Sequence, residues 1–323
     1  MSTSTTRARR ATHLRASTPH PLHTDAAQLG LRRLVVPTSV GNIVVRTGRE
    51  TGENSTPAAE AVATIFLHGA AGSWTTWTPL LAASDRRESP LTNAILIDLP
   101  GWGESGDARR IADVEQLSDA IVEVAAALGY SQWSLVGHSL GGFIALDIAA
   151  RFSEQTREVT LISASGIGVI DAIRHRVRGG LALPGFAGML AVMRLLSAWD
   201  AAGRAVVRGV DRAGLMRAFT APLFVSNVDD SVIAAFAEEV RPASFAHAAR
   251  IAAEYEMRTW TAIVCPVRSV RGSRDVFAGE RDAAQLTELI RDFHEVRVPD
   301  AGHFANIERP DAVLASMIRQ NSR

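Results

Sequence analysis

The sequence predicts an α/β protein with a mostly parallel sheet, helices on both faces of that sheet, and an inserted all-helical segment. Short apolar runs alternate with longer stretches of helical periodicity along most of the 323 residues. This alternation stops between residues 166 and 260, where only helical periodicity continues. An apolar content of 47% and a charged content of 21% are typical of a globular protein with a substantial core.

Short runs rich in β-branched residues, most of them ending in turn residues, predict the strands. The first two are separated by a tight turn and predict a hairpin. Most of the others are apolar without alternation, so we expect strands that are buried on both faces. The predicted strands are Leu31–Pro37, Gly41–Arg46, Ala63–Leu67, Ala94–Ile97, Gln132–Val136, Val159–Ile162, Val267–Arg271 and Glu295–Val298.

Helical periodicity predicts helices over residues 113–129, 141–152, 280–292 and 308–320. Residues 166–260 show the same periodicity without a convincing strand, and an all-helical insertion between two strands of a sheet suggests a lid. The first half of this insertion is rich in arginine and the second half in acidic residues. We expect these charges to pair with one another rather than to form an anion site.

These patterns divide the chain into a disordered tail (1–28), a core (29–165 and 261–323) and a helical lid (166–260). The tail is basic and rich in serine and threonine. No apolar run reaches the ~20 residues of a membrane span, and we expect a soluble, cytoplasmic protein. Acidic and basic residues balance at 34 each, which argues against a nucleic-acid partner.

The composition also excludes several kinds of chemistry. All basic residues other than histidine are arginine, which excludes Schiff-base chemistry and Ser-Lys dyads. Cys265 is the single cysteine, so an intramolecular disulfide and a cysteine-rich metal site are excluded. We therefore expect no metal and no cofactor, and the expected partner is a small-molecule substrate. The oligomeric state stays open.

A candidate nucleophile lies between a predicted strand and a predicted helix. The stretch Gly137-His138-Ser139-Leu140-Gly141 is a Gly-x-Ser-x-Gly motif, and it lies directly between residues 132–136 and 141–152. A serine at such a sharp turn is exposed on a strained backbone, and its neighbours must be small so that the elements can pass closely. The helix behind it directs unpaired N–H groups toward any negative charge that develops there.

A serine needs a base and a group that orients this base. The predicted base is His303, which follows the last strand, where loops gather at the carboxyl edge of a parallel sheet. The predicted orienting acid is Asp275, which follows the preceding strand at the same edge. Asp300 is the rival acid. Because it shares one tight loop with His303, we expect its carboxylate not to reach the far ring nitrogen of His303 easily. His68 and His138 are expected to hold loops together.

An oxyanion intermediate needs two donors aimed at it. The candidates are the backbone N–H groups of Ala70, in the stretch Leu67-His68-Gly69-Ala70, and of Leu140, directly after the serine. The chain order Ser139, Asp275, His303 is the order of the Ser-Asp-His triad in α/β-hydrolases.

Over residues 30–320 the chain resembles the lidded members of the α/β-hydrolase fold family. Five motifs carry this resemblance in the family's order: Leu67-His68-Gly69, Asp98-Leu99-Pro100-Gly101-Trp102-Gly103-Glu104-Ser105, Gly137-His138-Ser139-Leu140-Gly141-Gly142, Gly272-Ser273-Arg274-Asp275 and Gly302-His303-Phe304. The resemblance implies the same roles for Ser139, Asp275, His303, Ala70 and Leu140. It identifies no substrate, because this fold hosts many chemistries.

The leading hypothesis is a serine esterase that acts on a small, largely apolar substrate through an acyl-enzyme. Hydrolysis of a carbon–carbon bond in a ring-cleavage diketone is an alternative that the resemblance allows, although such enzymes often carry Asn where this chain has His138. Cofactor-free haloperoxidase activity or acyl transfer is a further alternative. A small-molecule receptor on the same fold is the alternative outside the enzymes.

Overall fold

The computed structural model describes residues 20–50, 61–164, 166–199 and 201–318. These residues form an eight-stranded sheet in the order β1-β2-β4-β3-β5-β6-β7-β8. β2 pairs antiparallel with β1 and β4, and all other neighbours are parallel. The strands are β1 (Leu31–Thr38), β2 (Gly41–Gly48), β3 (Val62–Leu67), β4 (Ala94–Ile97), β5 (Gln132–His138), β6 (Thr156–Ile162), β7 (Val267–Gly272) and β8 (Phe293–Val298). The predicted fold class is confirmed.

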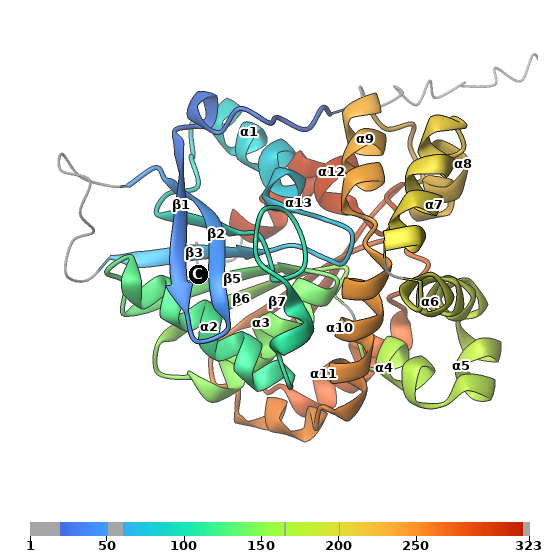
Figure 1. Ribbon diagram of the computed structural model, residues 1–323. Coiled ribbons are helices and arrows are strands. Elements are labelled where there is room, and N and C mark those ends of the chain that lie inside the picture. The colour runs from blue at the N-terminus through green and yellow to red at the C-terminus, as the bar shows by residue number, and fades with distance from the viewer. Residues whose placement is uncertain (1–19, 51–60, 165, 200, 319–323) are drawn as a thin grey trace, which may run out of the picture.

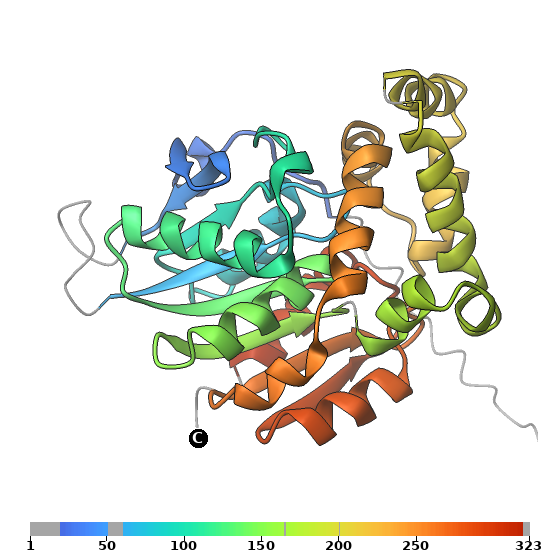
Figure 2. The same ribbon diagram turned by 60° about the horizontal axis from the view of Figure 1, so that its bottom comes forward.

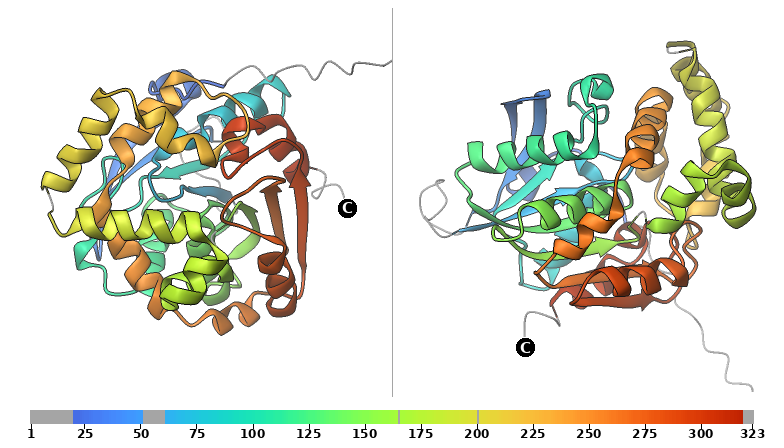
Figure 3. Two further views of the ribbon diagram at one scale, coloured as in Figure 1. Left: turned by 90° about the vertical axis from the view of Figure 1, so that its right-hand side faces the viewer. Right: turned by 90° about the horizontal axis from the view of Figure 1, so that it is seen from below.

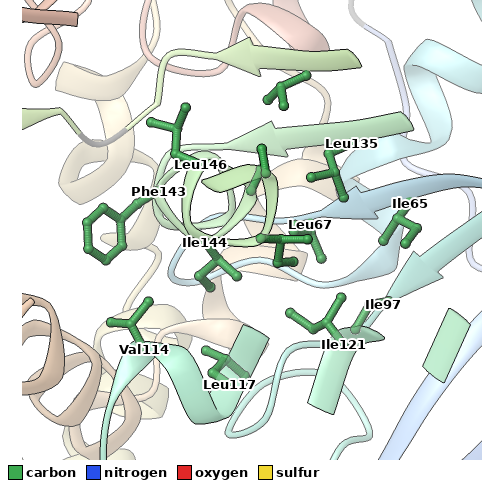
Figure 4. Packing of buried hydrophobic residues seen from close by; sticks show 14 of the residues in the cluster. Ile65, Leu67, Ile97, Val114, Leu117, Ile121, Leu135, Phe143, Ile144 and Leu146 are labelled. Carbon is green, nitrogen blue, oxygen red and sulfur yellow. The ribbon is translucent and has the colours of Figure 1, made fainter. Parts of the chain in front are cut away.

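Buried apolar side chains cover both faces of the central strands, as the continuous apolar runs predict. In β3, Ile65 and Leu67 face one core cluster while Phe66 faces the other. The first cluster packs against α2 (Val114–Ala127) and α3 (Leu140–Arg151), whose side chains lie against β3, β4 and β5 in Figure 4. The central strands are therefore fixed from two sides, which holds the loops at their carboxyl ends in place.

The helices of the core lie in two layers. α2, α3 and α11 (Glu280–Leu289) cover one face, and α1 (Thr78–Arg86), α12 (Ala305–Glu308) and α13 (Pro310–Ile318) cover the other (Figure 1). The four helices that periodicity predicts are present, with ends that shift by a few residues. α2 begins where the Asp113 carboxylate accepts a hydrogen bond from the Gln116 N–H at 2.8 Å, a normal N-cap.

Two helices, α1 and the short α12, were not predicted from the sequence. α1 carries Pro79 near its start and follows the 3-10 helix η2 (Trp74–Trp77), so threonine, tryptophan and proline obscure its periodicity. Both helices are largely buried against the second face of the sheet, and packing rather than local propensity stabilises them. Two further 3-10 helices are η1 (Ala27–Leu29) and η3 (Ala108–Arg110).

A helical insertion lies between β6 and β7, and its described residues contain no strand. Figures 2 and 3 show most of these helices gathered beyond one end of the sheet, while the last of them packs beside α3. They are α4 (Ile167–Arg174), α5 (Arg176–Ala182), α6 (Pro184–Ser197), α7 (Ala201–Arg212), α8 (Met216–Thr220), η4 (Ala221–Leu223), α9 (Asp230–Glu239), α10 (Pro242–Glu254) and η5 (Met257–Ala262).

Some of the opposite charges of the insertion pair with one another, as the sequence analysis expects. Arg217 contacts Asp230, and Arg204 contacts Glu238 at 3.5 Å. Other arginines are bound differently, since Arg174 donates to the carbonyl oxygens of Ala253 and Tyr255. These contacts join the early helices of the insertion to the late ones.

The amino end of the described chain packs on the core and the insertion. Leu22 is buried beside α9, and its N–H donates to the Ser231 hydroxyl at 2.8 Å. The His23 N–H donates to the Thr78 hydroxyl at 3.0 Å. The prediction of a disordered tail over residues 1–28 thus extends too far at its carboxyl end, because apolar burial holds Leu22. Residues 1–19 lie outside the described residues.

Candidate active site

Ser139 connects β5 to α3 through a strained turn. Its backbone has φ 51° and ψ −117°, a conformation that residues other than glycine rarely adopt. The strain is held by neighbouring backbone, since the Ser139 N–H donates to the Ile162 carbonyl at 3.1 Å and its carbonyl accepts from Gly142 at 3.0 Å. The turn places the serine at the carboxyl end of the sheet, on the wall of the cavity described below.

The two glycines of the motif allow the helix to lie against the strands. A Cβ atom on Gly141 would collide with the Leu67 carbonyl, and one on Gly137 would lie 2.5 Å from the Gly141 carbonyl. Only glycine fits at either position. Leu140 is the first residue of α3, where helix geometry leaves the N–H without an intrahelical partner.

His303 and Asp275 form a buried pair at the same end of the sheet. His303 Nδ1 lies 3.0 Å from Asp275 Oδ1, and the two side chains are 3% and 0% exposed. Asp275 follows β7 and His303 follows β8, so two parallel neighbours bring them together. The same Asp275 oxygen accepts the N–H groups of Phe277 at 2.9 Å and Ala278 at 3.1 Å.

These surroundings keep the Asp275 carboxylate ionised. Burial by itself raises the pKa of Asp275, but the charge of His303 and the hydrogen bonds from His303 and the Phe277 N–H outweigh it. The pKa of Asp275 therefore falls from 3.8 to about 2. An ionised partner at Nδ1 favours the tautomer with the proton on that nitrogen, which leaves Nε2 able to accept a proton.

Asp300, the rival acid, is placed differently. It adopts φ 52° in the turn before His303, and its N–H donates to the Ser273 hydroxyl at 3.1 Å. Its carbonyl accepts from the Arg309 guanidinium at 3.2 Å. The carboxylate hydrogen-bonded to the His303 ring is thus that of Asp275.

His68 and His138 hold loops together through hydrogen bonds to backbone groups, as predicted from the sequence. His68 Nδ1 lies 2.7 Å from the Gly69 carbonyl, and its Nε2 accepts the Leu99 N–H at 2.9 Å. His138 Nε2 lies 3.0 Å from the His303 carbonyl. Burial lowers the pKa of His68 to about 4 and, together with the charge of His303, that of His138 to about 3. Both rings are therefore neutral at physiological pH.

The loop after β3 supplies the other candidate donor. Ala70 and Ala71 both line the cavity with Ser139, and Ala71 has φ 61°. His68 fixes the start of this loop through its two hydrogen bonds. Ala70 and Leu140, the two candidate oxyanion donors, thus lie on the wall that also contains Ser139.

A largely apolar cavity of about 100 Å³ lies between the core and the insertion. Its volume suits a small organic group rather than a single water molecule. Ser139 and His303 belong to its wall, and most of the rest is aliphatic or aromatic. The insertion contributes, among others, Ile173, Phe186, Met189, Met193, Phe219, Leu223, Phe236, Phe245, Ala248, Ala249 and Ala252.

Several wall residues could not be recognised from the sequence. The ring centroid of Phe277 lies 4.8 Å from that of His303, and no sequence motif marks Phe277 as a residue of the site. Arg241 lines the cavity but is bound to the carbonyls of Gly101 and Gly103. Leu181, Trp199 and Leu215 are large apolar residues of the insertion as well, but they are exposed to solvent.

The described residues contain neither a metal-binding cluster nor a membrane-spanning helix. Among them, no three histidine, cysteine or acidic side chains gather closely enough to hold a metal ion. Within the same residues, no helix combines the length and the apolar character needed to cross a bilayer.

Comparison with known proteins places the chain in a family. The model of the alpha/beta hydrolase family matches residues 64–316. The dihydrolipoyllysine-residue acetyltransferase component of the acetoin cleaving system from Pseudomonas putida is 31% identical over 132 residues, 40% of this chain and 32% of that protein. An uncharacterized protein of Mycobacterium tuberculosis is 26% identical over 236 residues, 70% of this chain. The chain spans 65% of the length of this second relative.

Among solved structures, an esterase from Exiguobacterium antarcticum superposes with a TM-score of 0.67 at 15% identity. The match covers 90% of this chain and 100% of the esterase, and at this identity it establishes the shared fold. Since the family match extends over most of the core and the whole insertion, the chain belongs to the alpha/beta hydrolase family.

Proposed function

We propose that the protein is a serine hydrolase that cleaves carboxylic esters of small, largely apolar substrates through an acyl-enzyme. The observation that carries this proposal is the buried Asp275–His303 pair on a cavity whose wall also contains Ser139. A serine on a strained strand-to-helix turn, next to such a pair, is the arrangement that activates a hydroxyl for attack on an acyl carbon.

In the proposed reaction, the Ser139 hydroxyl oxygen attacks the acyl carbon while His303 Nε2 takes its proton. The Asp275 carboxylate holds the Nδ1–H and stabilises the imidazolium that forms. The N–H groups of Ala70 and Leu140 receive the negative charge of the tetrahedral intermediate. His303 then gives the proton to the leaving alcohol. It afterwards takes a proton from the water that attacks the acyl carbon, and returns it to the Ser139 oxygen as the acid is released.

The wall of the cavity supports an apolar acyl or alcohol part. Apart from Arg241, which is bound to backbone carbonyls and to Glu239, the residues contributed by the insertion carry no charge. A carbonyl with an aliphatic or aromatic substituent can bury its apolar surface here without leaving a charged group unpaired.

The proposal is tested by chemical labelling. A fluorophosphonate probe should modify Ser139, as seen by mass spectrometry of the intact protein and its peptides. Ser139→Ala should lose both labelling and hydrolysis of p-nitrophenyl esters. Ser316→Ala is the matched control, because this hydroxyl makes a local helix contact to Ala312 and should leave both unchanged. Labelling of another serine in Ser139→Ala would refute the assignment.

The reaction class is tested separately. Steady turnover of simple esters supports ester hydrolysis. Labelling of Ser139 without ester turnover, combined with cleavage of a ring-cleavage diketone, would instead favour carbon–carbon bond hydrolysis. Formation of a new ester when an alcohol is added would favour acyl transfer.

A further inference from the structure

Ser163 is a buried serine that lies directly after β6, behind the wall of the cavity. It is 1% exposed and does not line the cavity with Ser139. The Ser163 N–H donates to the Val270 carbonyl of β7 at 2.9 Å. Because β7 continues into the loop that contains Asp275, this contact places Ser163 at the same end of the sheet as the buried acid.

The backbone of Ser163 is strained. Its φ of 46° lies in the left-handed region, which serine rarely adopts and glycine adopts readily. Ser139, the candidate nucleophile, has a similar φ of 51°. Glycine would form the turn at Ser163 with less strain, so the presence of a side chain there indicates a use for it. The only functional group of that side chain is a hydroxyl.

The Ser163 hydroxyl and one oxygen of Asp275 are both buried, and neither has a hydrogen-bond partner among the described residues. The Oδ1 atom of Asp275 accepts three hydrogen bonds, from His303 Nδ1 and from the N–H groups of Phe277 and Ala278. The unpaired oxygen is Oδ2. A buried acceptor without a donor costs free energy, and so does a buried hydroxyl without an acceptor.

The two unpaired groups lie close enough to influence each other. Burial raises the pKa of Asp275, while His303, the Phe277 N–H and the Ser163 hydroxyl lower it. A hydroxyl has this effect when it donates toward the ionised form of a carboxyl group. Rotation of a serine side chain about its own bonds is enough to align a nearby hydroxyl with an acceptor. One hydrogen bond would then satisfy both buried atoms.

We propose that Ser163 is a positioning residue whose hydroxyl donates to Asp275 Oδ2 and fixes the plane of this carboxylate against the His303 ring. The three donors at Oδ1 hold one point of the carboxylate, and a donor at Oδ2 holds a second point. Ser163 does not reach the substrate, because it lies outside the cavity wall. It acts only through Asp275, on the Nδ1–H that orients the candidate base.

This inference extends the arrangement proposed above to a third strand, and it rests on that proposal. Ser163, Asp275 and His303 follow β6, β7 and β8, which are neighbours in the sheet. Each strand fixes the backbone from which one member of the chain of contacts projects. The left-handed turn at Ser163 then has a function, since it aims the hydroxyl at the acid from the side that the N–H groups do not cover.

Two substitutions remove the hydroxyl with opposite effects on the backbone. Ser163→Ala keeps the strained conformation, whereas Ser163→Gly relaxes it. Both should lower kcat for a p-nitrophenyl ester about tenfold and leave KM nearly unchanged, because one hydrogen bond to a charged group is lost while the cavity stays intact.

Ser84→Ala is the matched control for the loss of a buried hydroxyl. The Ser84 hydroxyl donates to the Leu81 carbonyl at 2.7 Å, away from the cavity wall, and kcat should not change in this variant. Full kcat in both Ser163 variants would overturn the proposal. A loss in Ser163→Ala that Ser163→Gly restores would overturn it too, because the backbone rather than the hydroxyl would then be responsible.

A double-mutant cycle shows whether Ser163 acts through Asp275. When Asp275→Asn is already present, Ser163→Ala should change kcat less than about twofold, because the carboxylate that the hydroxyl holds is gone. An equal, tenfold fall in both backgrounds would mean that the hydroxyl acts on another part of the site, and the proposal would fail.

Proton NMR tests the contact without any measurement of activity. The Nδ1–H of His303, in a charge-assisted hydrogen bond to a buried carboxylate, should give a signal far downfield. Both Ser163 variants should shift this signal, because the charge of the carboxylate is redistributed between its oxygens, and Ser84→Ala should leave it in place. An unchanged signal in both Ser163 variants would overturn the proposal. Absence of ester hydrolysis in the unchanged protein would refute the proposed function instead, and the signal would still show whether Ser163 holds Asp275.

Discussion

Three buried histidines lie around Ser139, and their partners separate their roles. His68 and His138 contact backbone groups and have low pKa values of about 4 and 3. Only His303 contacts a carboxylate through its ring. A neutral ring that already serves a backbone group is a poor general base, whereas a ring held by an ionised acid can accept a proton on its other nitrogen.

Replacement of each of the two candidate acids by asparagine tests this assignment. Asp275→Asn should lower kcat by up to ~10⁴, because the amide no longer fixes the tautomer of His303. Asp300→Asn is the control, since the recorded hydrogen bonds of Asp300 involve its backbone. Steady-state kinetics on one ester decide between them, and a larger loss in Asp300→Asn would show that Asp300 orients the base.

The same aspartate predicts a pH-dependent stability. The folded protein holds the pKa of Asp275 at about 2 against 3.8, so the ionised carboxylate stabilises the fold above pH 4 and this contribution disappears as the pH falls toward 2. The difference in the free energy of unfolding between the unchanged protein and Asp275→Asn should therefore shrink by about 2 kcal/mol from pH 5 to pH 2.

Urea unfolding at a series of pH values measures this difference. Other carboxyl groups titrate in both proteins and cancel from the comparison. A difference that stays constant from pH 5 to pH 2 would mean that the contact with His303 does not lower the pKa of Asp275 in solution.

At the level of elements, the sequence predicted most of the sheet because each strand is a buried apolar run followed by turn residues. Ser139, Asp275 and His303 follow three such runs, and the topology of a parallel sheet gathers them. α1 escaped prediction because Pro79 and the preceding threonines and tryptophans hide its period. The residues of the cavity wall could not be predicted either, since apolar periodicity does not distinguish the side chains that face Ser139 from those that face solvent.

α10 forms one side of the cavity with small residues. Ala248, Ala249 and Ala252 all line it, and each leaves space that a larger side chain would fill. With the unchanged protein, kcat/KM should rise several-fold per added carbon from acetate esters upward until the cavity is filled, because each buried methylene contributes ~0.8 kcal/mol.

Ala249→Leu should end this rise at a shorter acyl chain while acetate is still hydrolysed. Ala246→Leu is the matched control on the same helix, because Ala246 does not line the cavity. The series of p-nitrophenyl esters from acetate to octanoate measures both. Identical chain-length profiles in the two variants would mean that the acyl chain does not lie against α10.

At the scale of the whole molecule, hydrogen bonds fix the insertion to the core, and two sets of them lie beside the cavity. Arg241 donates to the carbonyls of Gly101 and Gly103, and the Gly103 N–H donates to Glu239 at 2.9 Å. On the other side of the cavity, the His303 N–H donates to the Leu223 carbonyl at 2.9 Å. The loop of the candidate base is thus built partly on the insertion, a connection between distant segments that no local pattern in the sequence reveals.

Glu308 strengthens this second connection. Its carboxylate is buried at 3% exposure and accepts three backbone hydrogen bonds, from Val225 and Ser226 at 2.7 Å and from Gly302 at 2.6 Å. Two of these donors belong to the insertion and the third precedes His303. One carboxylate therefore ties the insertion to the loop of the candidate base.

Removal of this carboxylate should affect both stability and activity. Glu308→Ala leaves three N–H groups without their acceptor, and we expect the free energy of unfolding to fall by about 3 kcal/mol, or more if water cannot replace the carboxylate. Because the Gly302 N–H loses its anchor, His303 should move from its place beside Asp275, and kcat should fall even where the variant is still folded. Glu288→Ala, an exposed position on α11, is the control. Urea unfolding and ester kinetics on the same samples separate the two effects. A variant that loses stability but keeps its full kcat would show that the insertion supports the fold without positioning His303.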